Sequence, residues 1–238
     1  MSKQRGYNRG PHNHSNQFNR DNPAHLAARA EDERRTRLVE QFMDSVYEKN
    51  DYNIRRITAT NLQKRGVDIV HTTKDGRQRK VDEKYAIKYY NKPLFTYSFE
   101  LYSRNNPNNM GWLIMPDSLT QDYALLWFKA NDDFTQITEY DLCIIDKEDL
   151  FKLIYKAGYH DNMIDEFLNY WDCRQYTQPD KNYSEKGTGR DHRRYYKLDF
   201  GISICQSMGL YEQPINIIIP KTELIKITKR RFRGKCPN

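Results

Sequence analysis

The sequence has no long run of apolar residues, and this absence excludes a membrane-spanning helix. Such a helix needs about 18 or more consecutive apolar residues, whereas 37% of the 238 residues are hydrophobic and 30% are charged. The N-terminal segment from Met1 to Arg20 also lacks the apolar stretch of a secretory signal. We therefore expect a soluble protein that has no membrane partner and is not exported.

Cysteine is scarce, and its spacing excludes two classes of small protein. The chain has four cysteines, Cys143, Cys173, Cys205 and Cys236, which are widely separated and form no C-x-x-C pair. A zinc ribbon or a dense disulfide framework needs closer, paired cysteines. Free, scattered cysteines are typical of a reducing compartment, so we predict a cytoplasmic protein.

Positive charge is concentrated at the two ends of the chain. The net charge is +7, of which residues 1–25 contribute +3 and residues 226–238 contribute +6, so that residues 26–225 carry −2. Clustered lysine and arginine neutralise the phosphates of nucleic acids. The charge distribution therefore favours nucleic acid as the partner, although tails that only improve solubility have the same composition.

The basic segments differ in composition. Residues 1–25 are rich in Asn, Arg, Gly and His with few apolar side chains, which predicts a disordered tail, and residues 226–238 are predicted to form a basic C-terminal tail. A third segment alternates cations with tyrosines, which suits single-stranded or distorted nucleic acid, although a solvated loop has the same composition. The candidate nucleic-acid-binding residues are Arg190, Arg193, Arg194, Lys197, Lys229, Arg230, Arg231 and Arg233.

Residues 26–225 have the pattern of a single mixed α/β domain. Leu38, Phe42 and Val46 recur every four residues and predict a helix over 24–50. Alternating and short apolar runs predict strands in the remainder, with a core over about 26–175 and an extension over 176–225. The predicted strands are 57–62, 66–72, 80–88, 94–103, 123–128, 142–145, 195–204 and 215–219, and one or two helices cover 147–171.

Acidic residues recur on the successive predicted strands. An Asp-Gly turn joins the strand that carries Asp68 to the strand that carries Asp82 and Lys84. Residues two apart on a strand project from the same face, so the two aspartates are expected to converge beside the lysine ammonium. Two carboxylates are typical Mg²⁺ ligands, and Mg²⁺ or Mn²⁺ there would activate water for attack on a phosphodiester. The alternative is an ordinary ion pair on an exposed hairpin.

These residues resemble a known motif. Gly66-Val67-Asp68 followed by Asp82-Glu83-Lys84 is similar to the signature of the PD-(D/E)XK nuclease superfamily. The resemblance implies a restriction-endonuclease-like αβββαβ core, with a mixed central sheet flanked by helices. It also implies that Asp68, Asp82 and the backbone carbonyl of Glu83 bind the metal and that Lys84 is catalytic. Glu40, on the first predicted helix, and Glu100, on the strand predicted over 94–103, are the auxiliary candidates.

The sequence therefore predicts a Mg²⁺-dependent endodeoxyribonuclease of this type. Two other functions fit the same composition. One is a catalytically inactive protein of this fold that binds nucleic acid through its basic tails. The other is an interaction or structural protein whose charged ends contact an acidic partner. Because function depends on the site and not on the fold, metal binding at Asp82 distinguishes the nuclease from the other two, and nucleic-acid affinity distinguishes those two from each other.

Overall fold

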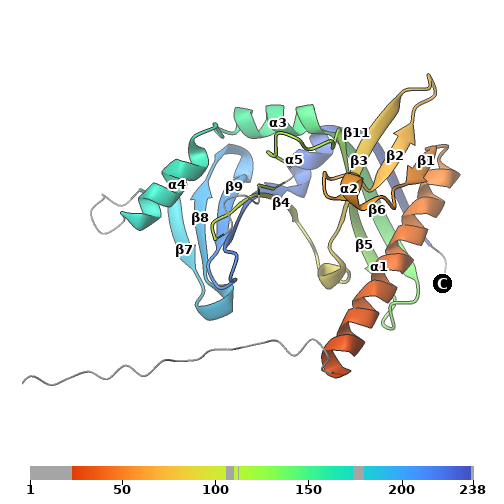
Figure 1. The fold of residues 1–238 in the computed structure, drawn as a ribbon, viewed down its shortest axis with the longest axis horizontal. Helices are drawn as coiled ribbons and strands as arrows, with labels where there is room; N and C mark the ends of the chain where they lie inside the picture. The colour runs from red at the N-terminus through yellow and green to blue at the C-terminus, as the bar shows by residue number, and fades with distance from the viewer. Residues whose placement is uncertain (1–22, 106–109, 112, 174–179, 237–238) are drawn as a thin grey trace, which may run out of the picture.

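The computed structural model describes residues 23–105, 110–111, 113–173 and 180–236. These residues form a mixed α/β protein with one mixed six-stranded sheet, one antiparallel sheet and five α-helices (Figure 1). The predicted mixed α/β class is therefore confirmed. Most of the predicted N-terminal tail, residues 1–22, lies outside the described residues.

The first sheet has the strand order β1-β2-β3-β5-β6-β11. Each pair of neighbours is antiparallel except β3 and β5, which are parallel. This sheet carries the strands on which the aspartate and lysine motif was predicted. Its strands are β1 (Ile54–Arg56), β2 (Ile69–Thr72), β3 (Gln78–Tyr85), β5 (Asp122–Ala130), β6 (Ile137–Asp146) and β11 (Thr228–Lys235).

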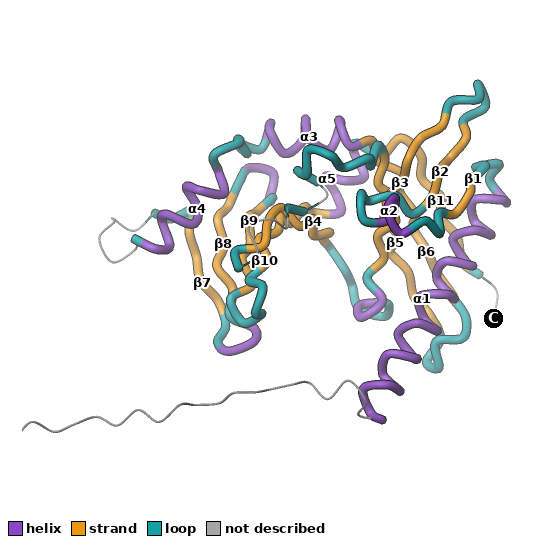
Figure 2. The backbone as a smooth tube through the Cα atoms, viewed as in Figure 1, coloured by secondary structure: helices purple, strands orange, loops and turns teal. Residues whose placement is uncertain are grey.

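The second sheet is antiparallel and has the order β4-β10-β9-β8-β7. The chain passes from β3 through a short 3-10 helix, Ile87–Tyr89, into β4, and so crosses from one sheet to the other (Figure 2). The strands of this sheet are β4 (Thr96–Ser103), β7 (Tyr183–Lys186), β8 (Arg193–Lys197), β9 (Ser203–Ser207) and β10 (Pro214–Pro220).

Helix α1 (Pro23–Lys49) covers one face of the first sheet. Its apolar residues Val39, Met43 and Tyr47 are fully buried, at spacings that place them on one side of a helix. They pack in one cluster with Val81 of β3 and Leu126 of β5. The helix predicted over 24–50 is confirmed, and its buried stripe fixes which face of β3 points toward α1.

The opposite face of the first sheet shares a core with the second sheet. Tyr123 and Leu125 of β5 belong to the same buried cluster as Phe99 of β4 and Ile217 of β10. Helices α3 (Lys147–Lys156) and α4 (Met163–Asp172) also contribute to this cluster. The two sheets are thus joined by one hydrophobic core. The remaining helices are α2 (Thr60–Gln63) and α5 (Lys221–Lys226).

Several predicted strands differ from the structure. The strand predicted over 94–103 is present as β4, but it pairs with β10 in the second sheet and not with β3. The segment 57–62 contains part of a helix, α2, in place of a strand. The segment 195–204 is divided into β8 and β9 by a turn in which Phe200 has φ 56°, a left-handed backbone that no strand continues through.

The prediction of a basic C-terminal tail over residues 226–238 is wrong. Thr228–Lys235 form β11, which pairs antiparallel with β6 at the edge of the first sheet. The side chain of Arg231 donates two hydrogen bonds to Asp141 of β6, at 2.7 and 2.8 Å, and Lys229 is paired with Asp146. Ion pairs with acidic side chains on β6 therefore hold this basic segment at the edge of the first sheet.

We predict unequal effects for two arginines on β11. Arg231→Met should lower the free energy of unfolding by about 1–3 kcal/mol, because it removes a two-point bond to a carboxylate that is 8% exposed. Arg233 is 3.9 Å from the same carboxylate and its side chain is 66% exposed, so Arg233→Met should cost less than about 0.5 kcal/mol. Urea denaturation measures both, and equal effects would show that β11 is not held by the Arg231 contact.

Candidate active site

The β2–β3 hairpin brings Asp68 and Asp82 together. Gly66, with φ 75°, adopts a left-handed conformation that turns the chain out of α2 and toward β2. The amide of Asp68 then donates to the carbonyl of Val81 at 2.9 Å, so Asp68 directly precedes β2 and lies beside β3. Its carboxylate accepts a hydrogen bond from the amide of Glu83 at 2.8 Å, which fixes it next to the Asp82 side chain.

Asp82 is a buried carboxylate with few partners. The residue is 1% exposed, and burial raises its pKa to about 6, with the Lys84 ammonium lowering it and the Asp68 carboxyl group, at hydrogen-bonding distance, raising it. Its Oδ2 atom is paired with the Lys84 ammonium. Placing the half-buried Asp68 carboxyl group beside a buried carboxylate is unfavourable unless a cation compensates.

Lys84 lies on the same face of β3 as Asp82, as predicted. Its Nζ is 3.0 Å from Asp82 Oδ2 and its side chain is 25% exposed. The ammonium also lies 5.7 Å from the centre of the Tyr123 ring on β5. Lys84 thus presents a positive charge at the boundary between the buried carboxylate and solvent, where an anionic group can approach.

The side chain of Glu83 faces the other side of the sheet. It accepts hydrogen bonds from the Tyr47 hydroxyl at 2.9 Å and from Arg56 at 2.7 Å. Burial raises the pKa of Glu83 to about 7, against the lowering effect of the Arg56 guanidinium. These bonds anchor β3 to α1. The sequence analysis did not identify this anchor, because Tyr47, Arg56 and Glu83 lie in three separate segments of the chain.

The backbone of Glu83 is placed toward Asp68. In a strand, the amide and carbonyl groups of one residue point to the same side, and the amide of Glu83 donates to Asp68. Its carbonyl oxygen is therefore expected on the side of the two aspartates. This orientation agrees with the role that the sequence assigned to that oxygen.

The donor set fits a hard divalent cation. Mg²⁺ prefers oxygen ligands and commonly takes one or two carboxylates together with water and substrate phosphate. Asp68, Asp82 and the Glu83 carbonyl are all oxygen donors, and the two carboxyl groups lie at hydrogen-bonding distance from each other. Within the described ranges, no group of three His, Cys, Asp or Glu residues is placed to hold a metal ion. Because Mg²⁺ prefers octahedral coordination, a cation held by these oxygen donors would retain positions for water and substrate.

The two auxiliary glutamates lie on opposite sides of this centre. Glu40, on α1, accepts a 3.3 Å hydrogen bond from Tyr85, and no contact with either aspartate is found among the described residues. Glu100, on β4, lines a cavity of about 220 Å³ together with Lys84 and Tyr123. Partial burial raises the pKa of Glu100, as does Glu212, while Lys84 lowers it. The structure thus brings Glu100, and not Glu40, to the lysine side of the site.

Position 111, in the wall of this cavity, requires a glycine. A Cβ at Gly111 would lie 1.8 Å from the carbonyl oxygen of Glu100, so only glycine permits the chain to pass this close to β4. The hydroxyl of Tyr123, which also lines the cavity, is buried and has no hydrogen-bond partner among the described residues. The polar side-chain groups beside this cavity are therefore the Lys84 ammonium and the Glu100 carboxyl group, with the Tyr123 hydroxyl buried in its wall.

The structure adds a second lysine to the site. Lys147, the first residue of α3, donates a 3.2 Å hydrogen bond to the hydroxyl of Ser118. Burial lowers the pKa of Lys147, and the charge of Asp82 opposes that effect, which places the ammonium within electrostatic range of the carboxylate pair. Sequence reasoning missed this residue because nothing in the local pattern of α3 distinguishes it.

The predicted nucleic-acid-binding residues divide into two groups on different sheets. Arg190, Lys197 and Arg230 are exposed. Arg194 is paired with Glu185 at 3.1 Å and lies over the Trp171 ring, and Lys229 and Arg231 are paired with β6 carboxylates. Arg193 is half-buried on β8 and Arg233 is exposed on β11. The eight residues therefore do not form one continuous patch.

We predict that metal stabilises the protein in a pH-dependent way. The raised pKa of Asp82, about 6, means that the metal-free native state loses stability as its carboxyl group ionises between about pH 4 and pH 6. A metal requires the ionised form, so the increase in Tm on adding Mg²⁺ should be small near pH 5 and full near pH 8. Thermal melting at the two pH values measures this, and an increase independent of pH would contradict it.

The described part of the chain contains no helix that is long and apolar enough to cross a membrane. Comparison of the chain with protein-family models, with curated proteins and with solved structures found no match.

Proposed function

We propose that the protein is a metal-dependent nuclease that hydrolyses phosphodiester bonds in DNA. The observation that carries this proposal is the pair formed by Asp68 and the buried Asp82, with the Lys84 ammonium 3.0 Å from Asp82. Two carboxylates and a cation beside an accessible cavity are the groups that phosphodiester hydrolysis needs. No comparison assigns a reaction, so the proposal depends on this geometry alone.

Each residue of the site has a defined task in this proposal. Asp68, Asp82 and the Glu83 carbonyl would hold Mg²⁺ or Mn²⁺, which when bound lowers the pKa of a water molecule and polarises the phosphoryl group. Asp82 holds the Lys84 ammonium at the edge of the cavity, where Lys84 orients the attacking water and stabilises negative charge on the phosphate. The hydrogen bonds from Tyr47 and Arg56 to Glu83 hold β3 against α1 and β1.

The finer fold assignment belongs to the same proposal. Helix α1 packs on the sheet that contains β2, β3 and β5, and α3 follows β6 on the other face. This order of helix, strands and helix supports a restriction-endonuclease-like core. The parallel pairing of β3 with β5 and the second sheet are departures from the three consecutive antiparallel strands that the sequence predicted.

A cleavage assay tests the proposal. Purified protein is incubated with supercoiled, linear duplex and single-stranded DNA in the presence of Mg²⁺, Mn²⁺ or EDTA. Cleavage that requires a divalent ion would support the proposal, and the substrate that is cut fastest would define the type of nuclease. Metal-independent, salt-sensitive DNA binding without cleavage would favour a non-catalytic nucleic-acid-binding protein. The absence of both binding and cleavage would favour a protein that interacts with other proteins.

A further inference from the structure

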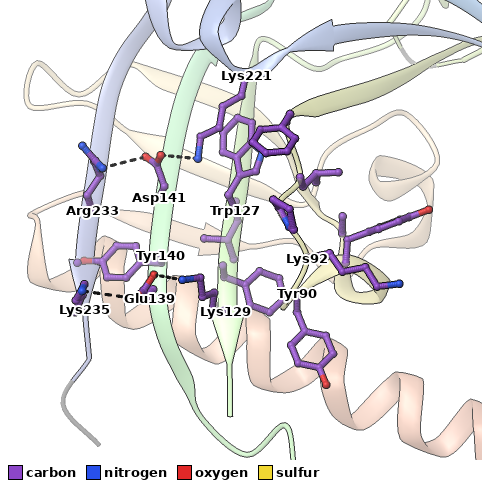
Figure 3. A pocket seen from close by; sticks show the side chains of 18 residues that line it. Tyr90, Lys92, Trp127, Lys129, Glu139, Tyr140, Asp141, Lys221, Arg233 and Lys235 are labelled. Atoms are coloured by element: carbon purple, nitrogen blue, oxygen red, sulfur yellow. Dashed lines mark ion pairs between the residues drawn. The ribbon is translucent and has the colours of Figure 1, made fainter. Parts of the chain in front are cut away.

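A second, larger cavity lies farther along the same face of the first sheet. It has a volume of about 530 Å³ and is formed by the segment between β3 and β4 together with β5, β6 and β11 (Figure 3). Trp127 forms part of its wall, with the ammonium of Lys221 4.4 Å from the centre of the indole ring. The residues of the candidate active site are not among those that line this cavity.

Aromatic side chains in this cavity are exposed to an unusual degree. Phe95 is 72% exposed and Tyr89 is 47% exposed, and both line the cavity. Leaving a phenylalanine ring in water forgoes the favourable free energy of burying it, and exposed apolar groups gathered in a concave surface are typical of binding sites. The two rings are available as flat surfaces for stacking.

The charge of the cavity lining is strongly positive. Its carboxylates are Glu139 and Asp141, and each is shared by more than one cation: Lys129 and Lys235 contact Glu139 at 2.8 and 3.6 Å (Figure 3). In the same way, Lys221 and Arg233 contact Asp141 at 2.7 and 3.9 Å. Lys92 also lines the cavity and forms no ion pair with any residue that the structure describes. The lining therefore has an excess of positive charge, which suits an anionic ligand.

The cavity and the candidate active site lie along the same face of β5. Tyr123 lies beside Lys84, and Trp127 follows four residues later on the same face, a separation of roughly 13 Å. The hydroxyl oxygen of Tyr97 lies 2.7 Å from the carbonyl oxygens of both Lys84 and Leu126 and shares its one hydrogen between them, which links β4 to β3 and β5 between the two cavities. A separation of this size corresponds to roughly two to four nucleotides of a strand.

We propose that this cavity binds unpaired nucleotides of the strand that is cut. The exposed rings of Tyr89 and Phe95 stack with bases and the lysines and arginine contact phosphates, since aromatic platforms in a basic groove are the means by which proteins hold single strands. Bases in a duplex are already stacked on each other and cannot enter. This inference rests on the proposed nuclease function and gives its substrate class, a nucleic acid with a single-stranded segment.

Binding measurements in EDTA test the inference independently of catalysis. The probes are a fluorescein-labelled oligothymidine and a labelled blunt-ended hairpin duplex. The variant Tyr89→Ala/Phe95→Ala should bind the oligothymidine about 10- to 100-fold more weakly than the wild type, because each lost stacking contact weakens binding severalfold or more. Its affinity for the duplex should change less than about threefold, because duplex binding depends on phosphate contacts.

A matched variant serves as the control. Phe200→Ala/Tyr211→Ala removes two aromatic rings that are 45% and 89% exposed and do not line this cavity. It should bind both probes as the wild type does. Unchanged oligothymidine affinity in Tyr89→Ala/Phe95→Ala, or an equal loss for duplex and oligothymidine, would overturn the inference. If metal-dependent cleavage were still present, the nuclease proposal would stand. If oligothymidine binding depended on the two rings but no cleavage occurred, the nuclease proposal would be contradicted. The proposal of a single-strand binding site in this cavity would still hold.

Discussion

Replacing Asp82 with asparagine is expected to reduce metal-dependent cleavage about a thousandfold or more. A bound metal contributes several kcal/mol of stabilisation to the transition state, and each 1.36 kcal/mol corresponds to a factor of ten in rate. Asparagine has nearly the same size as aspartate and fits the same buried position, but it lacks the charge that holds the cation and the Lys84 ammonium. The measurement is the single-turnover rate of DNA cleavage in Mg²⁺.

Asp122→Asn provides a matched control for that variant. Asp122 is 2% exposed and accepts a 2.6 Å hydrogen bond from Arg79. It pairs in register with Val81, whereas Asp82 pairs with Tyr123, so the two aspartates lie on opposite faces of the first sheet. Asp122→Asn should reduce stability but not the cleavage rate of the folded protein. Equal losses of activity in both variants would mean that Asp82 acts only through folding.

Replacing Lys84 with methionine is expected to separate catalysis from metal binding. The cleavage rate should fall about 100- to 10,000-fold, the range for loss of a positioned catalytic group, while Mn²⁺ binding at high pH is retained. The Lys84 ammonium lowers the pKa of Asp82, so its removal should raise that pKa further. Metal binding by Lys84→Met should therefore require a higher pH than in the wild type, because the metal needs the ionised carboxylate.

The control for this variant is Lys152→Met on α3. Lys152 forms an ion pair with Asp149 at 2.8 Å, as Lys84 does with Asp82, but its side chain is 72% exposed. Its replacement should change neither the cleavage rate nor the pH dependence of Mn²⁺ binding. If Lys84→Met cut DNA at the wild-type rate, the ammonium would have only the structural task of neutralising Asp82.

The helices and strands that depend on the local pattern of apolar and turn residues were predictable from the sequence. The four-residue recurrence indicates the helix α1, the alternation along β3 indicates which side chains share a face, and the Asp-Gly turn joins β2 to β3. The pairing of β4 was not predictable in this way. Its partner, β10, lies more than 100 residues later in the chain and pairs with a register shift between Ile215 and Asn216, and no local signal determines such a long-range choice.

The same distinction applies to the site. The positions of Asp82 and Lys84 follow from strand alternation, and that of Asp68 follows from the hairpin, so their convergence was predictable. The contacts of Glu83 with Tyr47 and Arg56 and the approach of Lys147 depend on how distant segments pack. The basic segment at the C-terminus was misinterpreted because its charges suggested a phosphate-binding arm, whereas the carboxylates that it pairs with lie on β6.

A Mn²⁺ titration followed by electron paramagnetic resonance shows whether the two aspartates bind a metal ion. We expect the wild type and Asp122→Asn to bind Mn²⁺ near pH 8, and Asp68→Asn and Asp82→Asn not to bind it. If all four proteins bound Mn²⁺ equally, or if none bound it, the two aspartates would not be metal ligands. The proposed active site would then be wrong.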